Sequence, residues 1–216
     1  MTFIQKIFAI SIKAGNVVAR SMIRVVLYFN IDLYMRLYTQ HLAYCGVRMQ
    51  GIPKFISNDV YFDGSDYSLI SIGDNIVISR EVMFLTHDYS LTAGLAALGQ
   101  QKRRGQGEVY VLRPIAVGND CFIGARVSIL PGANIGDNVV IGAGSVVVGH
   151  IPSNSVAAGN PCRVVGQTNS WARDKIEKGG FLTEGAEAPI GTPPPYAASA
   201  KCVSSQVASV DQQYGS

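Results

Sequence analysis

The chain has 216 residues, and its 18 Lys and Arg against 15 Asp and Glu give a formal net charge of +3. That length suits one domain with appendages, and the 23 glycines suit a fold with many tight corners. Four cysteines without paired spacing, and an N-terminus without the length and flanks of a cleavable signal peptide, favour a reduced, cytoplasmic protein. We expect no nucleic-acid partner.

Residues 1–46 are rich in Ile, Val, Leu, Phe and Tyr, and predict one or two helices. The first 50 residues carry six basic side chains against Asp32 alone, a net charge of +5. Basic residues recur too often for a membrane span, which needs about 20 mostly apolar residues in a row. The helices therefore either cover the exposed end of the following domain, the structural default, or make peripheral contact with an anionic membrane through residues 1–50.

Residues 47–166 contain a pattern that repeats every six residues. Its groups open on Val or Ile, and most carry a small or β-branched residue four positions later. The opening residues of the later groups are Val117, Ile123, Ile129, Ile135, Ile141 and Val147. A period of six fits neither a helix nor a simple strand, so each group predicts a short strand followed by a corner. Three groups form one triangular coil of 18 residues, which places Ile135 directly above Val117.

The same pattern starts earlier, at Ile72, and is then interrupted. Val117 lies 45 residues after Ile72, whereas one coil uses 18 residues, so 27 residues are extra. We place them at residues 90–116 as a loop extruded from the coil. Long loops within compact domains are uncommon and usually functional. His87 lies where the chain leaves the coil for this loop.

Residues 167–216 lack the six-residue pattern and are rich in Gly, Pro, Ala and Ser. A short helix near Trp171–Lys178 and a flexible tail after Gly179 are expected.

The repeated pattern resembles that of the hexapeptide-repeat acyltransferases, whose mainly β domain is a left-handed parallel β-helix. It is similar to the galactoside and maltose O-acetyltransferases and to acetyltransferases of polysaccharide biosynthesis, and the resemblance covers about residues 47–166. It implies a homotrimer, acetyl-CoA as the acyl donor and a saccharide acceptor. No metal is expected.

His87 is the candidate catalytic base. A histidine titrates near neutrality and can accept a proton from an attacking hydroxyl or amine, which typically gives a rate factor of about 10² to 10⁴. A lone histidine more often only packs or caps a corner, but the position of His87 before the loop, with the resemblance, favours catalysis. Asp88 is not assigned as its partner, because neighbours on a strand point to opposite faces. A backbone carbonyl would orient the ring equally well.

The resemblance implies coenzyme contacts at Ala125, Ala143 and Arg163. Small side chains let a ligand approach the backbone, and an arginine can pair with phosphate. The two alanines would also serve as simple corner packing. Two departures from the family are Val148-Gly149, where the galactoside enzyme has Thr-Lys, and Gly166, where it has a second arginine.

The γ-class carbonic anhydrases share this coil and bind zinc through three histidines. His87 and His150 hold the same place in their groups, which predicts one column two coils apart. That separation of about 9–10 Å is too large for one zinc ion, and His41 lies in the helical segment.

We therefore expect an acetyl-CoA-dependent O-acetyltransferase acting on a saccharide or polysaccharide precursor, in the cytoplasm or at the inner membrane face. N-acetylation of an amino sugar or sugar nucleotide is the alternative reaction. A non-catalytic trimeric scaffold is the alternative class.

Overall fold

The computed structural model describes residues 18–63, 66–101, 103, 105 and 107–179. The chain divides into two compact units, residues 1–168 and 169–216, which we describe separately. Helix α4 (Thr168–Lys178) begins one residue before the second unit and is the short helix expected from the sequence. The tail expected beyond Gly179 lies outside the described residues.

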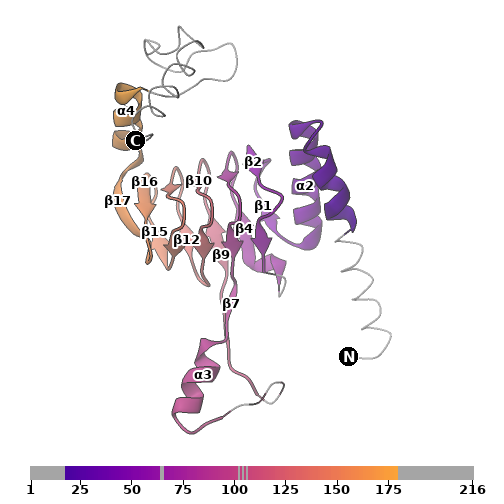
Figure 1. Cartoon of the computed structure of the whole chain (residues 1–216), viewed down its shortest axis with the longest axis vertical. Coiled ribbons are helices and arrows are strands. Elements are labelled where there is room, and N and C mark those ends of the chain that lie inside the picture. Colours follow the sequence, from indigo (N-terminus) through magenta and orange to yellow (C-terminus); the bar gives the residue numbers. More distant parts are fainter. Residues whose placement is uncertain (1–17, 64–65, 102, 104, 106, 180–216) are drawn as a thin grey trace, which may run out of the picture. The chain divides into compact units, whose positions relative to one another are not determined.

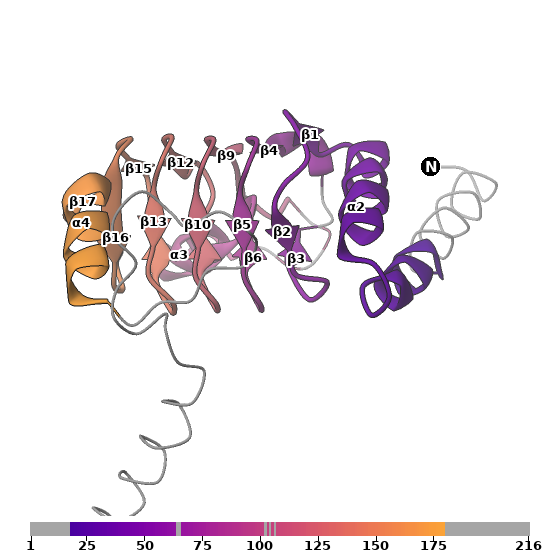
Figure 2. The ribbon, with the colours of Figure 1, turned by 90° about the horizontal axis from the view of Figure 1, so that it is seen from above.

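Within the described residues, two helices precede the coil, one over residues 18–26 and α2 over Ile31–Cys45. The side chain of Asn30 accepts from the Leu33 N–H and caps the start of α2, and Gly46, at φ 112°, ends it. The buried face of α2 packs on the first coil, where the Tyr34 hydroxyl donates to the Ile56 carbonyl at 2.8 Å. Figure 2 shows α2 against this end of the coil, so the expected covering of the first coil is confirmed.

The coil consists of three sheets of short strands, which Figure 1 shows side on. The first sheet contains β1 (Arg48–Met49), β4 (Ile70–Ile72), β9 (Ile115–Val117), β12 (Asn134–Ile135) and β15 (His150–Ile151). The second contains β2 (Phe55–Ile56), β5 (Val77–Ile78), β10 (Phe122–Ile123), β13 (Val140–Ile141), β16 (Ser155–Ala158) and β17 (Arg163–Gln167). The third contains β3 (Tyr61–Phe62), β6 (Met83–Phe84), β11 (Ser128–Ile129) and β14 (Val146–Val147). A 3₁₀ turn, η1 (Tyr67–Leu69), precedes β4.

Pairing between successive coils is parallel, with β17 the antiparallel exception at the end of the second sheet. The left-handed parallel β-helix predicted from the sequence is confirmed. Ile72 pairs with Val117, and Val117 with Ile135, as the spacing predicted. The 27 extra residues therefore lie within this one coil.

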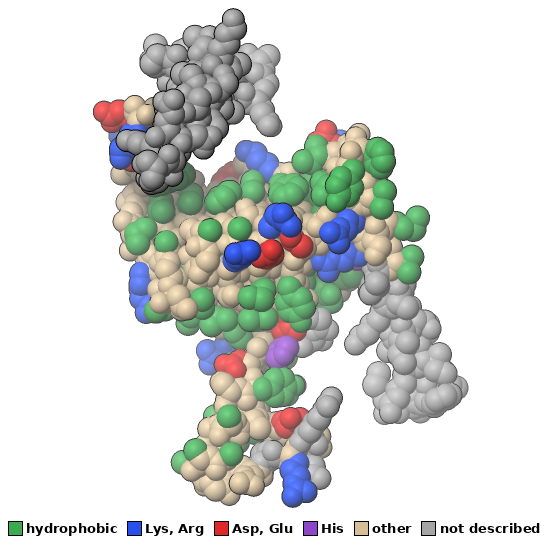
Figure 3. Space-filling model, viewed as in Figure 1, with side chains coloured by type: hydrophobic (Ala, Val, Ile, Leu, Met, Phe, Trp, Pro, Cys, Tyr) green, Lys and Arg blue, Asp and Glu red, His purple; other side chains and the backbone are tan. Residues whose placement is uncertain are grey.

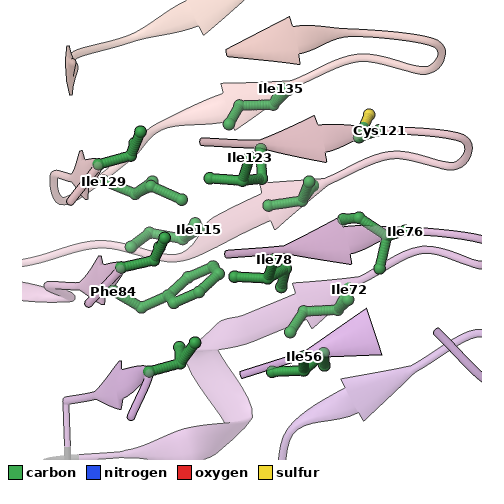
Figure 4. Close-up of a cluster of buried hydrophobic side chains, with 14 of the residues drawn as sticks. Ile56, Ile72, Ile76, Ile78, Phe84, Ile115, Cys121, Ile123, Ile129 and Ile135 are labelled. Atoms are coloured by element: carbon green, nitrogen blue, oxygen red, sulfur yellow. The ribbon is translucent and has the colours of Figure 1, made fainter. Parts of the chain in front are cut away.

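The core is a stack of mostly aliphatic side chains from the opening position of each group, joined by side chains from four positions later such as Ile76 and Cys121 (Figure 4). In the two-residue strands of the coil after β1, the second residue points inward and is nearly or fully buried, as at Ile78, Ile123 and Ile141, each 0% exposed. Phe84 is also fully buried and stacks on Phe62 with ring centroids 5.1 Å apart. Burial of such side chains, each worth about 1.5–3 kcal/mol, is what stabilises a fold with so little regular strand.

Corners between strands repeat from coil to coil and explain many of the glycines. A Cβ added at Gly73 would lie 2.4 Å from the Gly118 carbonyl oxygen, so only glycine lets these coils stack. Two residues further along the corner, Asn138 and Asn154 both adopt positive φ, and the amide of Asn138 donates to the side-chain oxygen of Asn154 at 2.8 Å.

The repeat shortens before Ile151, contrary to the unbroken run of sixes expected from the sequence. Ile151 pairs with Ile135 and is 3% exposed, so it opens a new group only four residues after Val147. Val148 and Gly149 form the tight turn, and Gly149 supplies the positive φ of 75° that it needs. His150 is therefore in β15, where it pairs with Asn134. The prediction that His150 stands in a column with His87 is wrong.

The insertion begins and ends as a two-stranded hairpin and carries its own helix. The chain leaves the coil through β7 (His87–Asp88), forms α3 (Ser90–Ala97) and returns through β8 (Val111–Leu112), which pairs antiparallel with β7. Figure 1 shows this hairpin and α3 projecting from the coil. Residues 115–116 already belong to β9, so the excursion starts and ends a few residues earlier than the predicted 90–116.

Candidate active site

His87 is held by a buried carboxylate that lies 24 residues earlier in the chain. Its Nδ1 contacts the Oδ2 of Asp63, whose side chain is 3% exposed against 31% for the histidine. A carboxylate only accepts, so Nδ1 is the donor, and the lone pair of the neutral ring is on Nε2. The arrangement fixes both the orientation and the tautomer of the ring.

Asp63 is itself fixed by its neighbours on the coil. Its Oδ2 also accepts from the backbone N–H of Thr86 at 3.0 Å and from the Thr86 hydroxyl at 2.9 Å. Burial raises the pKa of the Asp63 carboxyl, but the hydrogen bonds from Thr86 and His87 outweigh it and hold that pKa below its usual range. Asp63 is therefore a carboxylate at neutral pH.

Asp88 has a different task, in agreement with the decision not to pair it with His87. Its two carboxylate oxygens accept from the backbone N–H of Ser90 at 2.7 Å and from the Ser90 hydroxyl at 3.0 Å. These bonds satisfy the N–H of the first residue of α3 and lower the pKa of Asp88. Asp88 thus orients the inserted helix.

One face of the hairpin carries aromatic rings beside the histidine. In the β7–β8 pairing His87 lies opposite Leu112 and Asp88 opposite Val111, so Tyr89 and Tyr110 follow as the next facing pair. Tyr89 makes an edge contact with the His87 ring, with centroids 5.4 Å apart, and stacks on Tyr110 at 4.7 Å. The histidine therefore stands at one end of a row of three rings.

Ala125 and Ala143, predicted to contact the coenzyme, lie at equivalent corners of neighbouring coils. The Gly144 N–H donates to the Ala125 carbonyl at 2.8 Å, so the corners stack directly. Ala125 is half-buried and Ala143 exposed. The corner offers small side chains and accessible backbone, which fits a ligand that binds along it.

Arg163, the third predicted coenzyme contact, begins β17 beyond the last coil. The turn before it begins at Gly159, whose carbonyl accepts from the Val146 N–H at 2.9 Å, which places it directly against the coil that carries Ala143. The Arg163 side chain is exposed, and its Nη1 donates to the Cys162 carbonyl at 2.8 Å. The predicted coenzyme residues therefore follow one edge of the coil.

The coenzyme edge lies where the strands of the third sheet begin, whereas His87 lies on the side where they end. The corners of Ala125 and Ala143 lead into β11 and β14, whereas His87 follows the exit of β6. A ligand that reached both within one chain would have to cross the outer face of this sheet, which exposes Tyr61 and Met83.

The other two histidines are separate from this site. His41 lies on α2, 3.7 Å from the Cys45 sulfur, and the Nδ1 of exposed His150 lies 3.1 Å from the Asn134 carbonyl. In the part of the chain that the structure describes, no three His, Cys, Asp or Glu side chains are grouped to hold a metal ion.

Sequence reasoning missed Asp63, Tyr89 and Tyr110. Asp63 could have been found by continuing the six-residue pattern into the preceding coil. Phe62 pairs with Phe84 of the next coil, so Asp63 lies next to the residues that lead from Phe84 to His87. The tyrosines gave no signal, because their pairing depends on the register of a hairpin that the sequence did not predict.

The fold and site combine a parallel β-helix built on a six-residue repeat with a carboxylate-held histidine at the base of an inserted hairpin. A family described as "Hexapeptide repeat of succinyl-transferase" matches residues 114–148. The galactoside O-acetyltransferase of Escherichia coli K12 is 44% identical over 110 residues, which cover 51% of this chain and 48% of that protein. The chain spans about half the length of the curated relatives it matches.

Two solved structures are also similar. A galactoside acetyltransferase in complex with coenzyme A is 28% identical, covers 81% of this chain and 90% of its own, and has a TM-score of 0.48. A maltose O-acetyltransferase from Clostridium difficile 630 is 25% identical, covers 70% of this chain and 87% of its own, and has a TM-score of 0.46. The resemblance to the hexapeptide-repeat acetyltransferases that the sequence predicted is confirmed.

Proposed function

We propose that this protein is an acetyl-CoA-dependent O-acetyltransferase acting on a saccharide or polysaccharide precursor, with His87 as the general base. The observation that carries the proposal is the buried contact between His87 Nδ1 and Asp63. Acetyl-CoA would supply the acetyl group as a thioester.

His87 would take the proton of the acceptor hydroxyl on Nε2 as the oxygen attacks the carbonyl carbon of the thioester. The carbon–sulfur bond then breaks, and His87 returns the proton to the departing thiolate of coenzyme A. The ring becomes positively charged when it takes the proton, and the Asp63 carboxylate stabilises the charge while Thr86 holds the carboxylate in place. A base in this role typically contributes about 10²- to 10⁴-fold in rate. The carboxylate is already charged and need not change protonation.

The coenzyme would be held along the edge that carries Ala125, Ala143 and Arg163. The two alanine corners leave backbone groups accessible, and the exposed guanidinium of Arg163 suits a phosphate. Support comes from the relatives, one of which binds coenzyme A in its solved structure.

The proposed assembly is a homotrimer. The coil exposes apolar side chains on its outer faces, including Tyr61, Met83 and Phe122, at 52%, 38% and 43%. A second copy packed there would bury these side chains and could bring its coenzyme edge to the His87 of its neighbour. Light scattering on the purified protein gives the mass of the assembly.

Peripheral membrane contact through residues 1–50 is also part of the proposal. Met22, Tyr28 and Phe29 are 68%, 76% and 83% exposed, and Arg24 and Arg36 are exposed on the same helical segment. Figure 3 shows hydrophobic side chains gathered over these helices. Aromatic side chains with flanking cations suit an anionic membrane surface. Within the described ranges, no helix is both long and apolar enough to cross a membrane.

Thioester cleavage by wild type and His87→Ala, followed through the released thiol with a panel of saccharides, tests the enzyme. We expect a loss of about 10²- to 10⁴-fold in kcat for His87→Ala, with coenzyme binding retained. His150→Ala is the matched control and should keep wild-type turnover. Unchanged turnover in His87→Ala would remove this residue from the mechanism. Inclusion of amino sugars distinguishes O- from N-acetylation.

Arg163→Ala tests the coenzyme edge separately. Loss of one charged hydrogen bond to phosphate should raise the KM for acetyl-CoA by about 10-fold or more, with little change in kcat. An unchanged KM would remove Arg163 from the coenzyme site.

A further inference from the structure

We infer that Tyr89 and Tyr110 form the wall against which the saccharide acceptor binds, so that they set specificity for a sugar ring. The inference rests on the proposed function and deepens it. It starts from the row of rings on the inserted hairpin, where His87 is followed by Tyr89 and then Tyr110.

The pairing of β7 with β8 places the two tyrosines on the face that carries His87. Tyr89 directly follows β7, and its ring meets the His87 ring edge-on with centroids 5.4 Å apart, so it lies on the side of His87. Tyr110 lies opposite Tyr89 by continuation of the register, and their rings stack at an interplanar angle of 28°. A surface at these rings is therefore adjacent to the proposed base.

The wall is fixed by contacts on both sides of the hairpin. The Thr92 hydroxyl donates to the Val109 carbonyl at 2.7 Å, and the Val109 N–H lies 3.1 Å from the same hydroxyl oxygen. These bonds tie α3 to the returning strand beside Tyr110. At the coil, the Arg113 N–H donates to the Thr86 carbonyl at 3.0 Å.

Both tyrosines remain accessible, at 45% for Tyr89 and 48% for Tyr110. A buried pair would be core packing, whereas half-exposed rings beside a proposed base form a binding surface. The face of a tyrosine ring is apolar and can pack against the C–H groups on one side of a pyranose. The phenol at its tip can donate to or accept from sugar hydroxyls. The same combination suits an acyclic alcohol much less well.

The test compares Tyr110→Ala and Tyr110→Phe with wild type, using a pyranoside acceptor and glycerol. Tyr110 is chosen because it contacts Tyr89 rather than His87. For Tyr110→Ala we expect the KM for the pyranoside to rise about 10-fold, with kcat and the KM for acetyl-CoA nearly unchanged. Tyr110→Phe keeps the ring and should stay within about threefold of wild type.

Tyr44→Ala is the matched control, since Tyr44 is 78% exposed on α2. Its pyranoside KM should equal that of wild type, and glycerol kinetics should be the same in all variants. A pyranoside KM in Tyr110→Ala equal to wild type would overturn the inference and leave the proposed function standing. Failure of the wild-type protein to acetylate any saccharide would overturn both. Thermal unfolding of each variant confirms that the coil is intact.

Discussion

Replacement of Asp63 by Asn removes the negative charge behind His87 and leaves the side-chain shape unchanged. Both donors of Thr86 point at Oδ2 of Asp63, so they should hold the oxygen of the new amide at that position. The amide oxygen can still accept from His87 Nδ1. What is lost is the charge that stabilises the protonated ring in the transition state.

The size of the effect follows from that difference. A hydrogen bond to a charged group contributes about 1.5–3 kcal/mol, against about 0.5–1.5 kcal/mol between neutral groups. The difference of about 1–1.5 kcal/mol corresponds to about 5- to 15-fold in kcat/KM at about 1.4 kcal/mol per factor of ten. Asp63→Ala would lose the whole interaction and should cost about 10- to 150-fold.

The assay is release of the coenzyme thiol at saturating acetyl-CoA and varied acceptor. Asp88→Asn is the control, because Asp88 contacts Ser90 and not the histidine, and it should stay within about threefold of wild type. Equal losses in Asp63→Asn and Asp88→Asn would refute a specific role for Asp63. A loss above about 1,000-fold would show instead that Thr86 does not fix the amide, so that the wrong tautomer of His87 forms.

Other regions give further predictions. Phe84→Ala should lower the free energy of unfolding by about 3–5 kcal/mol in urea titrations, because Phe84 is 0% exposed and stacked on Phe62; a loss below about 1 kcal/mol would contradict its place in the core. The pKa of Asp63 is lower in the folded protein than the unfolded value of about 3.9, so its stabilisation is complete above about pH 4 and is lost as the pH falls through the folded-state pKa. The stability difference between wild type and Asp63→Asn should therefore shrink on acidification. Phe29→Ser with Arg24→Gln should reduce cosedimentation with phosphatidylserine vesicles but not with neutral ones, and unchanged cosedimentation would exclude this surface.

The coil could be predicted from sequence because its geometry is local. A two-residue strand and its corner fit within six residues, so the inward position appears directly as a Val or Ile at that period. The pairing of Ile72 with Val117 across the insertion followed from counting alone. The shortened turn at Gly149 escaped the count, because a loss of two residues leaves the pattern of apolar residues intact. The burial of the Ile151 side chain in the core shows that the six-residue pattern is shortened by two residues there.

The partner of His87 could not be predicted in the same way. Asp63 lies on the preceding coil, and adjacent coils bring together residues that share no short motif. Asp88 is the sequence neighbour, yet its carboxylate bonds to Ser90 at the start of α3. The tyrosine row depends on the register of β7 with β8, which is set by a loop whose sequence shows no regular period.

The two ends of the coil differ in a way that limits growth of the protein into fibres. A stack of parallel strands could in principle continue from one molecule into the next, since each coil offers the same unpaired backbone groups to its neighbour. At the first coil, the buried face of α2 occupies the place that another coil would take. At the last, β17 turns back antiparallel to β16 and breaks the register that an incoming parallel strand would need. The repeat can therefore be lengthened within a gene without the protein polymerising end to end.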